Sequence, residues 1–411
     1  MACGPPRCGR VAAVTTSTGT TTGAALRLAR LAVTVAYVGQ GISFAVLVTR
    51  IPALQDKFGL DDGTLTILVA LVPIIAGVGS VVAGSFVERR GSRAVLRVMG
   101  PVVPLALVVV GFAPDVPVLL VGLAVIGFGL GAVDASMNIA GVRVQDDMGR
   151  SLVAGFYATW SLAGFVGALL ASAAAGTSLS LGVFFLIVAV LLIPVQVAVG
   201  RWLLPGHPTP QELSSETAVI HWRPVLLVGI ALMCVYIADS GASTFGAEYL
   251  NKGLGSTESV AALSFAAYTI MTVAGRIIVN RTVDRIGPVP LVRVGGLVGV
   301  VAAVGIAVAP NAPLAILAFA VLGLGICPAI PLAFTAAASH DKTSSGLAVA
   351  RVNVFNYVGF VVGVPLIGGV AQGSSWRWAF AVLVPVLLVV PLLAGWFRVA
   401  RHEAPDAVPG A

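Results

Sequence analysis

The segment GSFVERRGSRAVLR, residues 84–97, largely decides the fold because its pattern occurs twice in the chain. Its acidic, basic and glycine positions return 196 residues later in NRTVDRIGPVPLVR, residues 280–293. Glycine and proline are common in membrane helices and align by chance, but matched charges make chance a poor explanation. The chain is therefore predicted to hold two copies of one unit. The matched positions are Gly79, Glu88, Arg89, Gly91 and Arg97 in the first copy and Gly275, Asp284, Arg285, Gly287 and Arg293 in the second.

Composition places both copies in a membrane. Of the 411 residues, 58% are hydrophobic and only 10% are charged, and the mean hydropathy is +1.01. A helix needs about 20 apolar residues to cross a bilayer, and such stretches follow one another here. We predict an all-α integral membrane protein with twelve transmembrane helices in two six-helix pseudo-repeats. The spans are expected near 28–49, 64–86, 95–113, 118–141, 151–174 and 178–200, and then near 224–249, 258–279, 290–309, 313–338, 346–370 and 375–398.

The distribution of basic residues predicts the orientation. With the N-terminus in the cytoplasm, only Arg50, Lys57, Lys252 and Arg377 of the 24 Lys and Arg residues lie outside, and the others, Arg276 among them, lie inside. Positive residues favour cytoplasmic loops, so both termini are predicted to be cytoplasmic, in a bacterial inner membrane. Topology also explains the net charge of +7 without a nucleic-acid partner.

Polar stretches between the apolar spans divide the chain into domains. The polar stretches indicate cytoplasmic tails and one linker. We predict a disordered tail at 1–26, six-helix bundles at 27–200 and 224–398, a cytoplasmic linker at 201–223 and a second tail at 399–411.

Four further motifs carry a family resemblance: RIPALQDKFGL at 50–60, GFGLGAVDASMN at 127–138, FYATWSLAGFVGA at 156–168 and SWRWAF at 375–380. With residues 84–93 they resemble the fucose-permease-related branch of the major facilitator superfamily. The family signature has Asp where this chain has Glu88, and Ser92 replaces a basic residue; the second copy lacks the opening Gly and the closing basic pair. The resemblance covers roughly residues 30–398 and implies the fold but not the substrate.

Two acids inside the predicted spans break the repeat. At the repeat spacing Asp134 corresponds to Ile330 and Asp239 to Ser43 or, with a small gap, to Ala45, so the fold itself requires neither carboxylate. A charged side chain in a helix bundle is costly unless it pairs or lines water. We predict that both acids bind the coupled proton. The structural alternatives are hydrogen bonding of Asp134 to Asn138, its pairing with Arg143 or Arg351, and hydrogen bonding of Asp239 to Ser243 or Tyr236.

Polar and aromatic groups at mid-depth are candidate substrate ligands. Asn353 and Asn356 share a helix face, which suits either a polyhydroxylated or amide-bearing substrate or hydrogen bonds between helices. Trp160 lies away from the interfacial belts and either stacks on a substrate ring or packs in the core. The predicted substrate-binding set is Asn138, Trp160, Asn353, Asn356, Gln40 and Tyr236.

The recurring charges are predicted to control how the two halves close. Glu88 and Asp284 are expected at cytoplasmic helix ends, bonded to helix N-termini or to nearby Arg residues; a plain topological charge patch is the alternative. The predicted gating set is Gly84, Glu88, Arg89, Gly91, Arg93, Asp284, Arg285, Gly287, Arg143 and Arg351.

These features favour a monomeric, proton-coupled carrier that works by alternating access on a small molecule, either a polar metabolite or a sugar. A proton antiporter that exports a drug or secondary metabolite is the alternative, although the helix at 151–174 lacks the Gly-Pro pattern of drug antiporters. No cofactor is expected besides the proton gradient. The chain contains no HExxH, GxSxG or GxxxxGK[ST] motif, which disfavours an enzyme. A non-transporting sensor has little need of buried acids.

Overall fold

The computed structural model describes residues 23–205, 220–341 and 346–399, and the described chain is almost wholly helical. Most of the predicted tails at 1–26 and 399–411 and most of the linker lie outside the described residues. The first half contains α1 (Gly23–Thr49), α2 (Ile51–Phe58), α3 (Asp62–Phe112), α4 (Val116–Met148), α5 (Val153–Ala175) and α6 (Leu181–Gly200). The second half contains α8 (Trp222–Glu248), η1 (Tyr249–Gly253), α9 (Glu258–Ile286), α10 (Pro288–Val308), α11 (Ala312–Ile326), α12 (Ala329–Ser339), α13 (Leu347–Gly373), α14 (Trp376–Ala381), α15 (Leu383–Leu393) and η2 (Ala394–Phe397).

Twelve membrane crossings result although only 11 described helices are long and apolar enough to span. The difference lies in α3, whose 51 residues cross twice. Gly91 interrupts this helix with φ 75° and ψ 159°, a backbone conformation that residues with a Cβ rarely adopt. The second half has its break at the matching position, where Gly287 with φ 86° separates α9 from α10. The glycine of the repeated segment therefore forms the turn between consecutive spans in both halves.

One predicted span, 313–338, is instead two helices, α11 and α12. Pro328 has no backbone N–H, so the carbonyl of Leu324 loses its helical donor. The thiol of Cys327 takes that place, with its Sγ 3.2 Å from the carbonyl oxygen. The helix breaks where this side-chain donor replaces the backbone donor, and α11 and α12 together still form one span.

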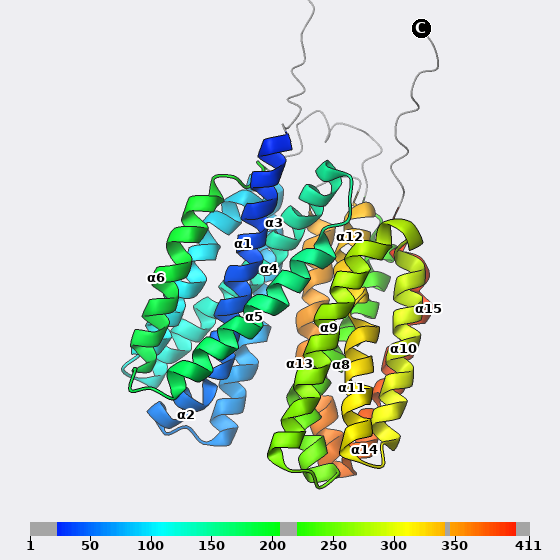
Figure 1. Cartoon of the computed structure of the whole chain (residues 1–411). Coiled ribbons are helices and arrows are strands. Elements are labelled where there is room, and N and C mark those ends of the chain that lie inside the picture. Colours follow the sequence, from blue (N-terminus) through cyan, green and yellow to red (C-terminus); the bar gives the residue numbers. More distant parts are fainter. Residues whose placement is uncertain (1–22, 206–219, 342–345, 400–411) are drawn as a thin grey trace, which may run out of the picture.

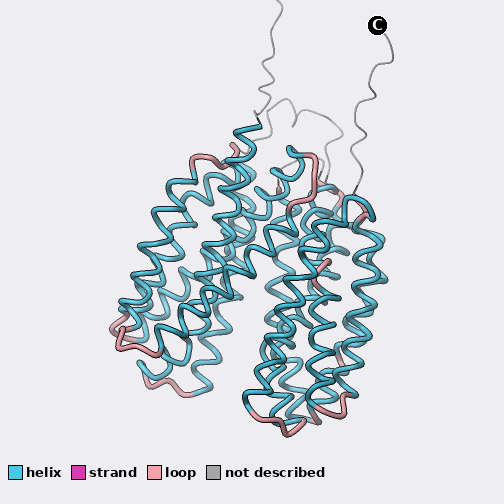
Figure 2. Tube along the Cα trace, viewed as in Figure 1, coloured by secondary structure: helices cyan, strands magenta, loops and turns pink. Residues whose placement is uncertain are grey.

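The two halves stand side by side as separate helix bundles (Figure 1). They meet through symmetrical helix pairs: α3 packs on α13 as α9 packs on α5, and α4 contacts α12. Their ribbons converge at the end where α1 begins and η2 ends, and diverge toward the opposite end (Figure 2). We call these the termini end and the far end. We call the contact of α3 with α13 the acid-side seam and that of α9 with α5 the Arg-side seam.

The outer surface is apolar. Leu392 is 73% exposed and Val301 69% exposed, and many Leu, Ile, Val and Phe side chains share this arrangement. A continuous apolar surface of this kind is stable in lipid rather than in water. Asp134, Asn353 and Asn356, by contrast, are buried where the two halves meet.

Candidate transport site

Asp134 lies in α4 at the contact between the halves. Only 6% of its surface is exposed. Its Oδ2 accepts hydrogen bonds from Asn356 Nδ2 at 3.2 Å and from the Tyr357 hydroxyl at 3.0 Å, and both donors lie on α13. A carboxylate of the first half is thus held by donors of the second half.

Asn138, one helical turn after Asp134, supports the acid from within its own half. Its Nδ2 donates to the Asp134 carbonyl oxygen at 2.9 Å and lies 3.5 Å from the carboxylate Oδ1. The Tyr37 hydroxyl donates to Asn138 Oδ1 at 2.8 Å. The predicted hydrogen bond between Asp134 and Asn138 is therefore present, but it accompanies the bonds across the interface rather than replacing them.

The alternative in which Asp134 pairs with Arg143 or Arg351 is wrong. Arg143 follows Asp134 by more than two turns of α4 and is exposed. Arg351 is half-buried and lies on a different face of α13 from Asn356. The ion pair found among the described residues joins Lys252 to Glu248, at 2.5 Å.

Gln40 and Trp160 form a second polar contact beside Asp134. The Trp160 Nε1 donates to Gln40 Oε1 at 2.7 Å, and Gln40 Nε2 lies 3.4 Å from the Leu130 carbonyl oxygen. The Trp160 ring also packs against Phe44, with centroids 6.1 Å apart. Because Trp160 remains half-buried, part of its ring is free for another contact.

Asn353 and Asn356 do share a face of α13, and this face points at the first half. Asn353 Nδ2 donates to Ser80 Oγ on α3 at 3.2 Å, and Ser80 in turn donates to the Ala350 carbonyl oxygen at 3.2 Å. Bonding between helices therefore accounts for both amide NH₂ groups. The buried Asn353 Oδ1 has no partner among the described residues.

Asp239 lies on α8 in the second half and is half-buried. The Tyr268 hydroxyl on α9 donates to its Oδ1. Ser243 donates to the backbone carbonyl of Asp239 at 2.7 Å, not to the carboxylate, so the Ser243 alternative is wrong. Half-buried Tyr236, one turn earlier on α8, lies within electrostatic range of both Asp134 and Asp239.

Arg276 is a residue that the sequence reasoning misplaced. It was predicted on the cytoplasmic side, yet α9 continues for ten residues beyond it and the side chain is only 5% exposed. Its Nη1 donates to the Tyr157 carbonyl oxygen at 3.2 Å and to Ser161 Oγ, both on α5. At the repeat spacing Arg276 corresponds to Ser80. That break in the repeat, the same signal that marked the two acids, was available in the sequence.

The predicted gating acid Asp284 contacts the other half at the termini end. Both carboxylate oxygens lie 3.3 Å from the Ser151 amide nitrogen, and the Ser151 hydroxyl also donates to Oδ1. Nearby, Asn280 Oδ1 accepts a hydrogen bond from the Gly155 amide at 3.1 Å. The acid thus meets the positive start of α5, as an acid at a helix N-terminus is expected to.

The first copy of the motif is arranged differently. Glu88 and Arg89 are exposed, and Arg93 is half-buried. Gly84 lies so close to α13 that a Cβ there would be 2.7 Å from the Ala350 Cβ. The glycine of the motif, rather than its acid, makes the contact between halves at the acid-side seam. Arg285, in the second copy, is exposed.

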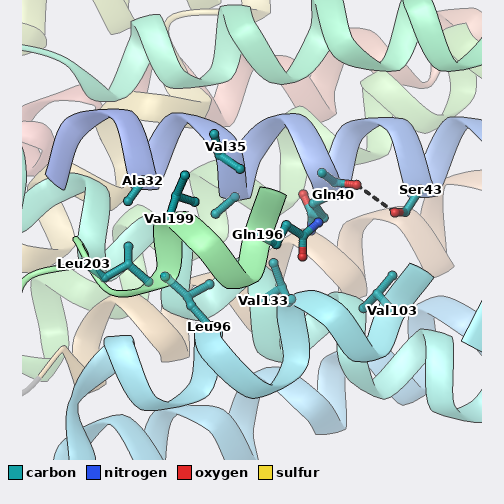
Figure 3. A pocket seen from close by; sticks show the side chains of 14 residues that line it. Ala32, Val35, Gln40, Ser43, Leu96, Val103, Val133, Gln196, Val199 and Leu203 are labelled. Atoms are coloured by element: carbon teal, nitrogen blue, oxygen red, sulfur yellow. Dashed lines mark hydrogen bonds between the residues drawn. The ribbon is translucent and has the colours of Figure 1, made fainter. Parts of the chain in front are cut away.

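A small cavity lies within the first half, between α1, α3, α4 and α6 (Figure 3). Gln40, Ser43 and Gln196 are its polar residues, and Gln196 Oε1 has no partner among the described residues. Its volume of about 20 Å³ suits one water molecule rather than a metabolite. In the part of the chain that the structure describes, no group of three or more His, Cys, Asp or Glu side chains is placed to hold a metal ion.

Two bundles that meet around buried polar groups are the architecture of a membrane transporter. The family model of the Major Facilitator Superfamily matches residues 33–228 and 228–411. The chain therefore belongs to this superfamily of transporters, which confirms the predicted family and excludes the enzyme alternative.

Individual proteins agree with this assignment. An uncharacterized MFS-type transporter of Yersinia pestis is 28% identical over 357 residues, which cover 85% of this chain and 91% of that protein. The crystal structure of FucP in the outward conformation superposes with a TM-score of 0.76 at 14% identity, over 91% of this chain and 99% of FucP. A second structure of FucP, described as the fucose:proton symporter of E. coli, gives a TM-score of 0.67 at 15% identity over 90% and 98%. At these identities the structures establish a shared fold.

Proposed function

We propose that the chain is a proton-coupled carrier that moves a small polar metabolite or sugar by alternating access, with Asp134 and Asp239 as its proton-binding groups. The observation that carries this proposal is the position of Asp134. It belongs to the first half, and Asn356 and Tyr357 of the second half hold its carboxylate.

This position links protonation to the packing of the halves. Hydrogen bonds to an ionised carboxylate are stronger than those to a neutral acid. Protonation of Asp134 therefore weakens the contact made by Asn356 and Tyr357. Proton binding and separation of the halves then influence each other reciprocally, which is the requirement for coupled transport.

Asp239 supplies a second protonatable group in the other half. It is half-buried, and the Tyr268 hydroxyl donates a hydrogen bond to it. Both Asp239 and Asp134 interact electrostatically with Tyr236. The repeat does not require either acid, so each is better explained by the substrate or the proton than by the scaffold.

Orientation and state follow from the same proposal. We place both termini in the cytoplasm of a bacterial inner membrane because the basic residues gather at the termini end. Because the halves meet at that end, we propose that this is the outward-facing state of the carrier (Figure 1). Similarity to FucP, a fucose:proton symporter, supports a sugar or similar polar substrate. We expect the carrier to act as a monomer and to use no cofactor other than the proton gradient.

The test uses proteoliposomes that contain a pH-sensitive dye and the purified chain. A panel of sugars, amino acids and cationic drugs is screened for substrate-driven proton movement. Asp134→Asn and Asp239→Asn should each abolish coupling while protein yield stays normal. Asp147→Asn, an exposed acid on α4, is the matched control. Coupling of wild-type size in the double Asn variant would refute the proposal. Proton exchange driven only by drugs would instead support the alternative function, a proton antiporter that exports drugs.

A further inference from the structure

Arg276 is a buried cation that forms no ion pair with any described residue. It is 5% exposed, and its described hydrogen bonds reach two neutral oxygens, the Tyr157 carbonyl and Ser161 Oγ. Its Nε has no partner, and the only ion pair among the described residues lies elsewhere. The guanidinium also stands 5.4 Å from the centre of the Tyr157 ring. A buried charge in this state carries a large desolvation cost, so the bundle retains it for a reason other than stability.

The repeat provides an internal comparison. The position of Arg276 in the first half is occupied by Ser80, which joins α3 to α13 through Asn353. A small uncharged hydroxyl therefore suffices for the contact at the acid-side seam. At the Arg-side seam the same contact is made by a full positive charge. The charge exceeds what joining the two halves requires.

The surroundings of Arg276 show which charge it lacks. Asp239 is close enough to interact electrostatically but not close enough for an ion pair. Arg276 also interacts electrostatically with Tyr236, Tyr268 and Cys327. A single guanidinium in this position balances a single negative charge. When Asp239 carries the proton of the proposed cycle, no acidic side chain of the described residues forms an ion pair with Arg276 to supply that charge.

We propose that Arg276 binds the carboxylate of the transported molecule, so that the substrate is a small hydroxylated organic acid such as a sugar acid. This inference rests on the proposed carrier function and narrows its substrate class. The planar guanidinium matches a carboxylate through two parallel hydrogen bonds. At the other contact between the halves, the acid-side seam, the unpartnered Asn353 Oδ1 is a buried acceptor suited to a hydroxyl group.

The same binding step affects the Arg-side seam. A carboxylate is a stronger partner for Arg276 than the neutral oxygens of Tyr157 and Ser161. Substrate that takes the guanidinium removes those two contacts between α9 and α5. Binding of the acid therefore loosens the termini end, where the halves are closed in this structure (Figure 1).

The test measures ligand binding to the purified full-length chain through thermal stabilisation and calorimetry. The probes are D-gluconate and D-galacturonate, with D-glucose and D-galactose as uncharged counterparts and glucose 6-phosphate as a phosphate ester. The acids should bind more tightly than the sugars. Arg276→Gln should raise the Kd for the acids by about ten- to a hundredfold, the range of a charge-assisted hydrogen bond. Arg30→Gln, at an exposed position on α1, should leave it unchanged.

Arg276→Gln should remain folded, because it removes an unpaired buried charge. If it does not, Arg276→Lys keeps the charge without the planar fork and should show an intermediate Kd. The inference fails if neither acid binds, if the sugars bind as well as the acids, if only the phosphate ester binds, or if Arg276→Gln binds the acids like the wild type. Sugar-driven proton uptake that needs Asp134 would leave the carrier function standing without this inference. Acid binding through Arg276 without proton movement would support this inference and contradict the proposed proton coupling.

Discussion

Tyr357→Phe tests whether the bond to Asp134 holds the halves together. The substitution removes one hydroxyl and leaves the ring in place, so packing changes little. The lost bond spans 3.0 Å between the Tyr357 oxygen and a carboxylate oxygen of the other half. A hydrogen bond to an ionised group contributes about 1.5–3 kcal/mol. Its loss should therefore shift the equilibrium toward opening at the termini end by about ten- to a hundredfold.

Spin labels at the termini end report this shift directly. Asp147 on α4 and Arg281 on α9 are exposed and belong to different halves, so a cysteine at each position carries a label without disturbing the interface. The native cysteines are replaced by serine. Pulsed electron resonance then gives the fraction of molecules with the longer distance. For an open fraction of about 1% in the parent, the expected shift gives roughly 10–50% in Tyr357→Phe.

Tyr249→Phe is the matched control. The Tyr249 hydroxyl donates to the Ile306 carbonyl oxygen at 2.7 Å, so the bond it loses lies within the second half. This variant should keep the parent distance distribution. An unchanged distribution in Tyr357→Phe, or an equal shift in both variants, would show that the bond to Asp134 does not hold the halves closed.

Three substitutions test the fold itself through thermal unfolding in detergent or through transport. Gly91→Ala should destabilise by about 1–3 kcal/mol because alanine is strained at φ 75°, whereas Gly369→Ala, with open space around it, should not. Cys327→Ala should lower the free energy of unfolding by about 1–3 kcal/mol, because the Leu324 carbonyl loses its donor. Cys327→Ser should restore most of that free energy. Gly84→Leu should slow transport by forcing α3 away from Ala350; an unchanged rate would contradict the close contact seen there.

Much of the architecture could be predicted from the amino-acid sequence alone. Apolar length fixes where helices cross a bilayer, and a repeated spacing identifies related halves; neither needs knowledge of partners. Gly91 and Gly287 illustrate this, because the repeated motif marked both as special and both form the breaks between spans. The fusion of two predicted spans into α3 and the break before α12 concern helix ends, which depend on local hydrogen bonds.

The site divides differently. The sequence marks Asp134 and Asp239 as candidates because each breaks the repeat inside an apolar span, whereas Arg276 resembles the basic groups near the ends of spans. The partners on other helices were not predicted. Tyr357, more than 200 residues from Asp134, supplies its donor, and Tyr268 rather than Ser243 binds Asp239.

The sequence by itself thus determined the spans, the two related halves and the acids that the scaffold does not require, since hydropathy and spacing are properties of the chain alone. Only the tertiary structure decided that Asp134 is held by the opposite half, that Arg276 is buried without an ion pair to a described residue, and that Asp284 but not Glu88 contacts a helix start. These outcomes depend on which helix faces pack together and on how far each side chain reaches, and side-chain hydrogen bonds are selected only once those faces have met.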